Sequence, residues 1–327
     1  AVVLASGKLV YYGPPADLPG YFGVTETSEV YDRLESERAD EWVKRYKAST
    51  FYQRYVIARS ATNVQSPKLA SVAELQANHR ESFKEMWRQM GVLTRRFATV
   101  LLQDRKNVLI LLAQASLVGL LLGMVFSKGT PQDHRLVVFL LTISAIWFGC
   151  INASREVVKE LPIYLRERAV NLQLFAYMGS KVLVLTTLCA VQCFMLLMIA
   201  SPMTKLEPQT VKIVVALLLT SWTGMLMGLV VSAFVDNADK AMAIVPVLLI
   251  PQVIFANVIA TLEGPTHMFA YSCMVSFWSV DAMLNSLPYA PGLAHHNWGQ
   301  GILALSLFMG AFMLAALLAL KRHDRLC

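Results

Sequence analysis

Long apolar runs dominate the part of the chain between Val108 and Leu320, and only short loops separate them. A helix needs about 20 predominantly apolar residues to cross the hydrocarbon core of a bilayer, and these runs approach that length. We therefore predict an all-α membrane protein. Its six transmembrane helices are expected at about residues 108–126, 136–152, 181–201, 210–234, 241–260 and 302–320.

Prolines are expected to end one of the predicted helices and to kink another. The second helix is expected to continue past the bilayer to Leu161, where Pro162 ends it, because proline cannot extend a helix from its interior. Pro246 and Pro251 lie inside the fifth helix and are expected to kink it, which leaves carbonyl groups that neighbouring helices must satisfy.

The composition is too apolar for an ordinary soluble domain, because 56% of the residues are hydrophobic and only 16% are charged. The net charge of +7 does not indicate a nucleic-acid partner, since Lys and Arg collect in the loops that flank membrane helices. Cys189 and Cys193 share a helix face without a nearby His or carboxylate. His295 and His296 likewise lack placed carboxylates, so we expect no metal site and no disulfide framework.

Lysine and arginine indicate the orientation of the chain. They are frequent in segment 153–181 and in the tail from Lys321 onward, and they are absent from segment 261–300. Because positive residues favour the cytoplasmic side, both termini are expected in the cytoplasm. The aromatic segment 261–300 is expected to form short helices that dip into the outer leaflet and return. A seventh span is the alternative, but it would place the Lys321 cluster outside.

The N-terminal third is more polar. Residues 1–24 begin with a predicted β-hairpin over 2–12, whose strands flank a turn at Gly7. A lone hairpin is marginal in water, so we expect it to pair with a sheet that this sequence lacks. The chain also lacks an initiator Met and is expected to be the tail of a longer polypeptide. Residues 25–77 are expected to form a polar helical region followed by a linker.

An amphipathic helix is predicted over residues 78–104, directly before the first span, in the domain that continues over 105–327. Basic side chains occupy the side of the helix opposite its apolar face, which is typical of a helix lying in the cytoplasmic membrane interface. Packing against another domain is the alternative. The apolar face consists of Phe83, Met86, Trp87, Met90, Leu93 and Phe97.

Four stretches resemble the G-type family of ABC half-transporters, in which an ATPase domain precedes an ABC-2 type membrane domain. Residues 6–24 resemble the last hairpin of that ATPase domain, and residues 83–107 resemble the connecting helix. Residues 232–260 resemble the fifth helix, and residues 154–181 resemble the intracellular loop. This loop carries the Arg-Glu-Arg of the coupling helix at Arg166, Glu167 and Arg168. The lack of a long, cysteine-bearing external loop makes the chain more similar to bacterial members than to animal ones.

The resemblance implies an ATP-driven exporter that is built from two such halves. The full-length protein would use ATP and Mg²⁺, but this chain has no GxxxxGK[ST] phosphate loop and is expected to bind neither alone. The expected partners are an upstream nucleotide-binding domain in the same polypeptide, a second half-transporter and membrane lipids. A homodimer is expected, with a heterodimer as the alternative, in a bacterial inner membrane.

The resemblance assigns the transmission of ATPase movement to charged residues after the second span. A short, rigid element that follows the Pro162 break can dock as a lever, and charges on it set the register of docking. The alternative is a solvated loop whose charges only orient the protein. The candidate coupling residues are Glu156, Glu160, Arg166, Glu167 and Arg168.

The resemblance also assigns the lining of a substrate cavity to the second and fifth spans. No charged residue lies midway along them to pair with an ion, so the cavity suits a lipid, a glycolipid or a hydrophobic compound. Packing and lipid contact are the alternative roles of such side chains. Polysaccharide export and a non-transporting scaffold or regulator are the alternative functions. The candidate cavity residues are Phe139, Ile143, Ile146, Trp147, Val247, Leu248, Ile254 and Phe255, while Gln114, Gln192 and Asn257 are expected to join helices by hydrogen bonds.

Overall fold

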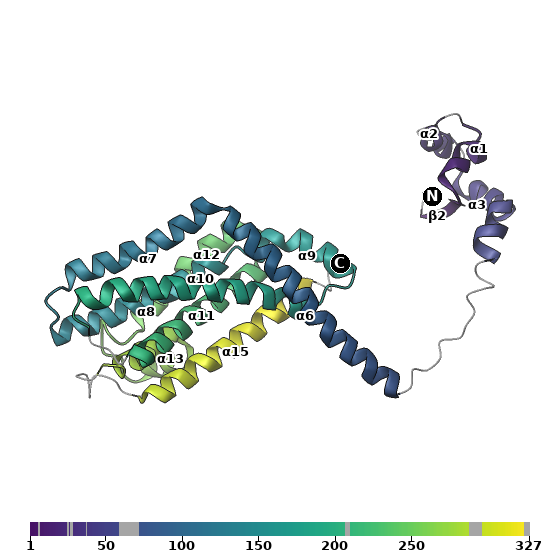
Figure 1. Cartoon of the computed structure of the whole chain (residues 1–327). Coiled ribbons are helices and arrows are strands. Elements are labelled where there is room, and N and C mark those ends of the chain that lie inside the picture. The colour runs from purple at the N-terminus through teal and green to yellow at the C-terminus, as the bar shows by residue number, and fades with distance from the viewer. Residues whose placement is uncertain are drawn as a thin grey trace. The chain divides into compact units, whose positions relative to one another are not determined.

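A computed structural model describes residues 1–5, 7–24, 26, 29–36, 38–58, 72–206, 210–287 and 296–323 (Figure 1). The chain divides into two compact units, Ala1–Asn78 and His79–Cys327, and each is described by itself. Most of the linker predicted to end at residue 77 lies outside the described residues, as does His295.

The first unit has an aromatic core. Strands β1 (Val2–Ala5) and β2 (Lys8–Tyr12) form the predicted antiparallel hairpin, and Gly7 adopts the positive φ of 74° at its turn. The sheet has two strands within the described residues, and it packs with short helices, so that Val10 and Tyr11 are buried completely. These helices are η1 (Pro15–Asp17), α1 (Leu18–Phe22), α2 (Glu29–Ser36), α3 (Ala39–Lys47), α4 (Thr50–Tyr52) and η2 (Gln53–Ile57).

The second unit is a bundle of long helices that the amphipathic helix α6 precedes in the chain (Figure 1). Short helices connect the long ones at two places, after α8 and after α12. In chain order the elements are α6 (Val72–Gln103), α7 (Arg105–Val125), α8 (Pro131–Ala153), η3 (Val158–Glu160), α9 (Leu161–Ala169), α10 (Leu174–Met203), α11 (Thr210–Phe234), α12 (Ala238–Ile254), α13 (Pro265–Cys273), α14 (Val275–Leu284) and α15 (Trp298–His323).

The all-α membrane fold is confirmed. Helices α7, α8, α10, α11 and α15 are long and apolar enough to cross a membrane. Helix α12, at the position of the fifth predicted span, is shorter, with 17 residues. At a rise of about 1.5 Å per residue it extends roughly 26 Å, which is close to the minimum for a span.

Two helix boundaries differ from the prediction. Helix α8 ends at Ala153 rather than at Leu161, and Pro162 lies in the first turn of α9 instead of ending α8. Proline is tolerated there because the first turn of a helix has no intrahelical partner for its N–H groups. Helix α12 ends at Ile254, short of the predicted Ala260, and a series of bends follows.

Within the described residues, two short helices, α13 and α14, lie between α12 and α15. They contain 9 and 10 residues and therefore extend about 15 Å each, roughly half of a hydrocarbon core. Every residue of α14 is buried, and this helix contacts α8, α11 and α15. The expectation of short helices in this segment is confirmed for the described residues, while their not crossing the membrane and their place in the outer leaflet stay predictions.

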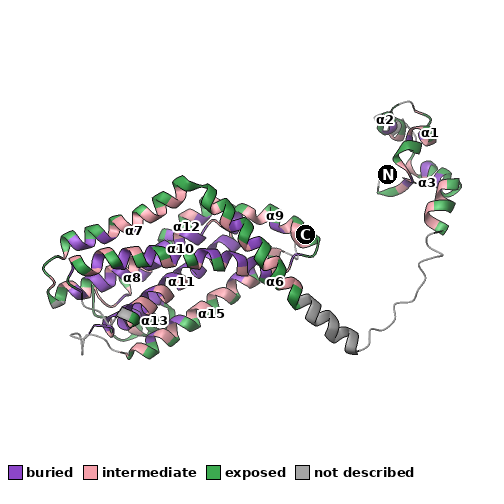
Figure 2. Ribbon diagram, in the orientation of Figure 1, coloured by how far each residue is buried: buried purple, intermediate pink, exposed green. Residues whose placement is uncertain are grey.

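The bundle is centred on the contact between α8 and α11, the most deeply buried of the long apolar helices (Figure 2). Three glycines make this contact possible. A Cβ atom at Gly149 would lie 2.1 Å from the Ser221 carbonyl oxygen, and one at Gly224 would lie 2.5 Å from that of Ile146. At Gly228 the corresponding distance to the Cys150 carbonyl oxygen is 2.4 Å. The two backbones therefore touch directly, as small residues allow in membranes.

A methyl group at Gly224 tests this contact. We expect Gly224→Ala to lower the midpoint of thermal unfolding in detergent, because overpacking costs about 1–3 kcal/mol. Gly310→Ala on α15 is the matched control, since a Cβ there meets nothing within 4 Å. Alanine also has the higher helix propensity, so the control should be neutral or stabilising. Equal effects of both substitutions would contradict the direct backbone contact.

Candidate coupling site on the charged loop after α8

The loop that follows α8 is attached to the end of α11. The hydroxyl oxygen of Ser232 on α11 accepts hydrogen bonds from the backbone N–H groups of Val157 and Val158, at 3.0 and 3.1 Å. Val157 and Ser232 are both buried. Because unpaired buried N–H groups are costly, this hydroxyl fixes the start of η3 and hence the helix α9 that follows.

A charge pair joins α9 to the amphipathic helix α6. Arg96 Nη1 lies 2.5 Å from Glu167 Oε1, and the second guanidinium nitrogen lies 3.5 Å from Oε2. The hydrogen bond with Glu167 raises the pKa of Arg96 above its ordinary value. Both side chains are partly exposed, so the pair contributes at most about 1 kcal/mol. Its effect is mainly to set how α6 and α9 align.

The turn after α9 is held by α6 as well. Gln89 Nε2 donates to the Asn171 carbonyl at 3.3 Å, and Gln89 Oε1 accepts from the Gln173 N–H at 3.0 Å. Asn171 adopts a positive φ of 90°, and the Arg168 guanidinium donates to the Leu172 carbonyl. One amide side chain and one guanidinium thus satisfy backbone groups of this turn.

Lys181 on α10 is the main residue that sequence reasoning missed. Its side chain is only 1% exposed, and its Nζ lies 2.7 Å from Glu160 Oε2 at the end of η3. The same ammonium lies 3.6 Å from the centre of the Phe97 ring on α6, a cation–π distance. Three elements that are distant in sequence therefore meet at one buried charge. In the sequence, Lys181 is grouped with the positive charges of the loop 153–181. The mostly apolar residues on both sides of it could have indicated that it is buried.

The five predicted coupling residues have different surroundings. Glu160 and Glu167 form ion pairs with other helices, and Arg168 holds the following turn. Glu156 pairs within its own loop, with Lys159 at 3.2 Å, and Arg166 is exposed. A groove of about 530 Å³ lies between α6 and the end of α9, and both Arg96 and Glu167 line it. The groove between α6 and the end of α9 is therefore bordered by charged groups.

Comparison with known proteins identifies the family. Residues 88–288, more than half of the chain, match the model of the ABC-2 type transporter family. The chain belongs to this family. It is 23% identical to the ABC transporter ATP-binding/permease protein Rv1747 of Mycobacterium tuberculosis, over 79% of this chain and 30% of that protein. It is 25% identical to ABC transporter G family member 5 of rice, Oryza sativa subsp. japonica, over 51% of this chain and 27% of that protein.

These relatives confirm the resemblance to G-type ABC transporters. The chain spans less than a third of the length of either curated relative, and the matched region is the ABC-2 membrane domain. The elements that carry the candidate coupling residues, which are the loop after α8, η3 and α9, lie inside the matched residues 88–288.

The predicted cavity residues of this ABC-2 membrane domain are not all accessible in the single chain. They lie on α8 and α12, two helices that contact each other, apart from Phe255 directly after α12. The side chains fall into three groups by exposure. Phe139 and Ile146 are buried between helices; Ile143, Leu248 and Phe255 are half-buried; Trp147, Val247 and Ile254 are exposed.

Of the three polar residues expected to join helices, Gln192 does so, and Asn257 lies after the end of α12. Gln192 on α10 accepts a hydrogen bond from Asn152 of α8 at 2.6 Å and donates one to the Leu111 carbonyl of α7 at 2.9 Å. Asn257 accepts from the Leu262 N–H at 3.0 Å and receives an Arg135 bond on its own carbonyl. These amides are therefore committed to structure.

Removal of the buried charge tests the junction at Lys181. We expect Lys181→Met to lower the free energy of unfolding in detergent by roughly 3 kcal/mol, because it leaves Glu160 without its buried partner. Lys240→Met, at an exposed lysine near the start of α12, should change little. The double variant with Glu160→Gln should be less destabilised than the sum of the single variants. Strict additivity would contradict the pairing.

Proposed function

We propose that this membrane domain is the driven half of an ATP-powered exporter for lipid-like, glycolipid or hydrophobic compounds. It would move them out of the cytoplasm or the inner leaflet by alternating access. The observation that carries the proposal is the charged segment formed by η3 and α9, in which η3 contacts α10 and α11 while α9 pairs with α6 and presents Arg166 to solvent. Family membership supports a transport role.

The proposed motor is a nucleotide-binding domain upstream in the same polypeptide, which would bind ATP and Mg²⁺. Movement of that domain would press on α9 and on the groove beside it. Contacts of α9 and η3 then offer a route into the spans, because Glu160 reaches Lys181 on α10 and the preceding turn reaches Ser232 on α11. This chain would supply the lever and the pathway, and no catalytic residue.

The proposed cargo class follows from the exposed face of α12. Ile244, Val247, Ile250 and Ile254 are all exposed and aliphatic, and the helix carries its charged residues only at its start. Such a surface suits acyl or other apolar groups better than sugars, which favour aromatic lining. Trp147 on α8 is the exposed aromatic residue among the predicted cavity positions. We therefore favour lipid-like cargo over polysaccharide.

The proposed assembly is a homodimer in a bacterial inner membrane, with both termini in the cytoplasm. Exposed apolar residues on α8 and α12 would face their copies across a shared cavity. The test is the ATPase rate of the full-length protein in vesicles, screened across lipids, oligosaccharides and hydrophobic compounds. Stimulation by lipids supports export, stimulation by oligosaccharides alone supports polysaccharide export, and an unresponsive or absent rate supports a scaffold.

Charge reversal at Arg166 tests the lever. We expect Arg166→Glu in the full-length protein to retain ATP hydrolysis but lose most transport, because the docking charge changes sign while the packing of α9 is untouched. Hydrolysis and transport are measured on the same vesicles. Arg322→Glu, at another exposed arginine, is the control and should preserve both. Normal transport by the Arg166 variant would refute the assignment.

A bulky residue at Val247 tests the cavity. We expect Val247→Trp to reduce lipid-stimulated ATPase activity and transport, because the ring would fill space between two copies. Val191→Trp on α10 is the control, since Val191 is also an exposed valine of a span but lies on neither proposed cavity helix. Equal loss in both variants would show a general effect of tryptophan and would count against the cavity.

A further inference from the structure

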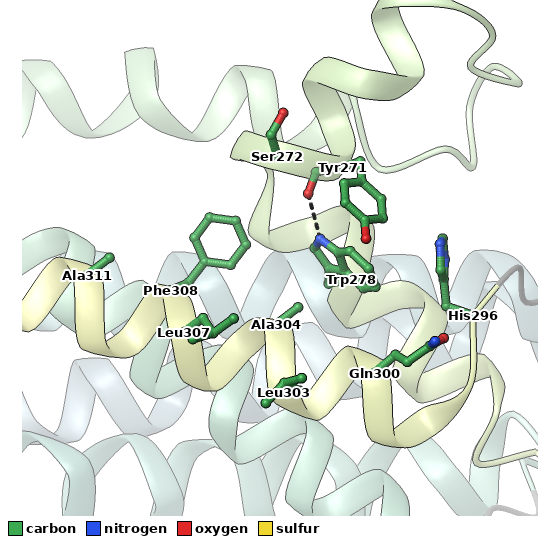
Figure 3. A pocket seen from close by; sticks show the side chains of 10 residues that line it. All are labelled: Tyr271, Ser272, Trp278, His296, Gln300, Leu303, Ala304, Leu307, Phe308 and Ala311. Atoms are coloured by element: carbon green, nitrogen blue, oxygen red, sulfur yellow. Dashed lines mark hydrogen bonds between the residues drawn. The ribbon is translucent and has the colours of Figure 1, made fainter.

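A pocket of about 490 Å³ lies between the short helices α13 and α14 and the long helix α15 (Figure 3). It contains none of the proposed coupling or cavity residues. Polar groups gather at one end, where Tyr271, His296 and Gln300 line the pocket. Along α15 the lining becomes apolar and includes Leu307 and Phe308.

The polar end is held rigidly. His296 Nδ1 lies 2.7 Å from Asp281 Oδ2, and this carboxylate belongs to the fully buried helix α14. The Trp278 indole N–H donates to the Tyr271 carbonyl at 2.7 Å (Figure 3). The Trp278 ring centre lies 4.6 Å from that of Tyr271 and 4.7 Å from that of His296. The pocket wall is therefore preformed, as ligand sites usually are.

The length of the pocket matches one leaflet of a bilayer. Its lining on α15 extends from Gln300 to Ala311, eleven residues along the helix, which corresponds to about 16 Å. Half of a hydrocarbon core is about 15 Å. A molecule with its polar group beside His296 and its apolar part along α15 would lie as a lipid lies in a single leaflet.

The charges near the polar end select the kind of head group. Segment 261–300 contains no Lys or Arg, and the acidic group at His296 is Asp281. Phosphate head groups are normally bound by Arg or Lys, and neither is among the described residues that line the pocket, which favours an uncharged head group. Because Nδ1 of His296 is hydrogen-bonded to the Asp281 carboxylate, its other ring nitrogen, Nε2, can form a hydrogen bond with a hydroxyl group. The Gln300 amide can donate to a hydroxyl or accept from it.

We propose that this pocket binds one uncharged, hydroxyl-bearing lipid from the leaflet beside the N-terminal end of α15. The hydroxyl would contact His296 and Gln300, and the apolar part would lie along Leu307 and Phe308. Diacylglycerol and glycosyl diacylglycerol share this chemistry. The lining of the pocket shares no residue with the proposed transport cavity, and binding to it requires neither ATP nor a working motor.

Photolabelling with lipid analogues tests the site. The protein is reconstituted in phosphatidylcholine vesicles with a diazirine-bearing diacylglycerol, glycosyl diacylglycerol or phosphatidylglycerol, and labelled peptides are mapped by mass spectrometry. We expect labels on α13 and α15 from the diacylglycerol, from the glycosyl lipid, or from both. Whichever neutral lipid labels the pocket identifies the source of the hydroxyl. Labelling by neither neutral lipid, or equal labelling by the anionic phosphatidylglycerol, would overturn the proposal.

Matched variants make the result specific. Leu307→Trp should reduce pocket labelling to background by filling the apolar end, while Leu314→Trp should leave it unchanged. Leu314 is an exposed leucine one heptad along α15 and does not line the pocket. His296→Ala should lower apparent affinity about threefold to tenfold through the lost hydrogen bond. Equal labelling of all three variants would refute the site. This outcome is independent of whether the intact protein exports lipids.

Discussion

Direct contact between the backbones of α8 and α11 is the constraint on which the rest of the bundle depends. Between helices in lipid there is little hydrophobic driving force, so association relies on close packing and hydrogen bonds. Gly149, Gly224 and Gly228 allow that closeness, because each faces a backbone atom of the other helix. Once α8 and α11 are set against each other, the end of α11 is also placed. Ser232 can then hold the turn that follows α8, so the glycine contact indirectly positions α9.

Two ion pairs brace the coupling loop, and their different burial gives them different roles. The pair between Glu160 and Lys181 includes a lysine that is almost fully buried, so separating it leaves a charge without water or partner. The pair between Arg96 and Glu167 is partly exposed, and water replaces either partner at small cost. The first pair therefore acts as a fixed point of the loop. The second costs little to break, so it helps to align α6 and α9 and is not an anchor of the loop.

The sequence predicted the elements that depend on local patterns and missed those that depend on distant neighbours. Apolar runs located the spans. A segment without Lys or Arg, whose apolar stretch is too short to cross, indicated the short helices α13 and α14. Pro162 was assigned to the wrong end of a helix, because proline is compatible both with stopping one helix and with starting the next. Lys181 was missed because its partners, Glu160 and Phe97, lie on other helices. The exposure of the cavity candidates likewise depends on packing, which buries Phe139 but not Val247.

The loop after α8 and the segment before α15 differ in chemistry, and this difference fits the two contacts proposed for them. The loop after α8 carries paired charges that can meet a moving protein domain, where exposed ion pairs set alignment. The segment before α15 carries no Lys or Arg and instead combines aromatic rings, a buried carboxylate and one imidazole. Such groups are suited to hydroxyls at the edge of an apolar phase. The two sets share no residue, but α11 links them, because it packs along α15 and its Ser232 holds the start of η3, which leads into α9.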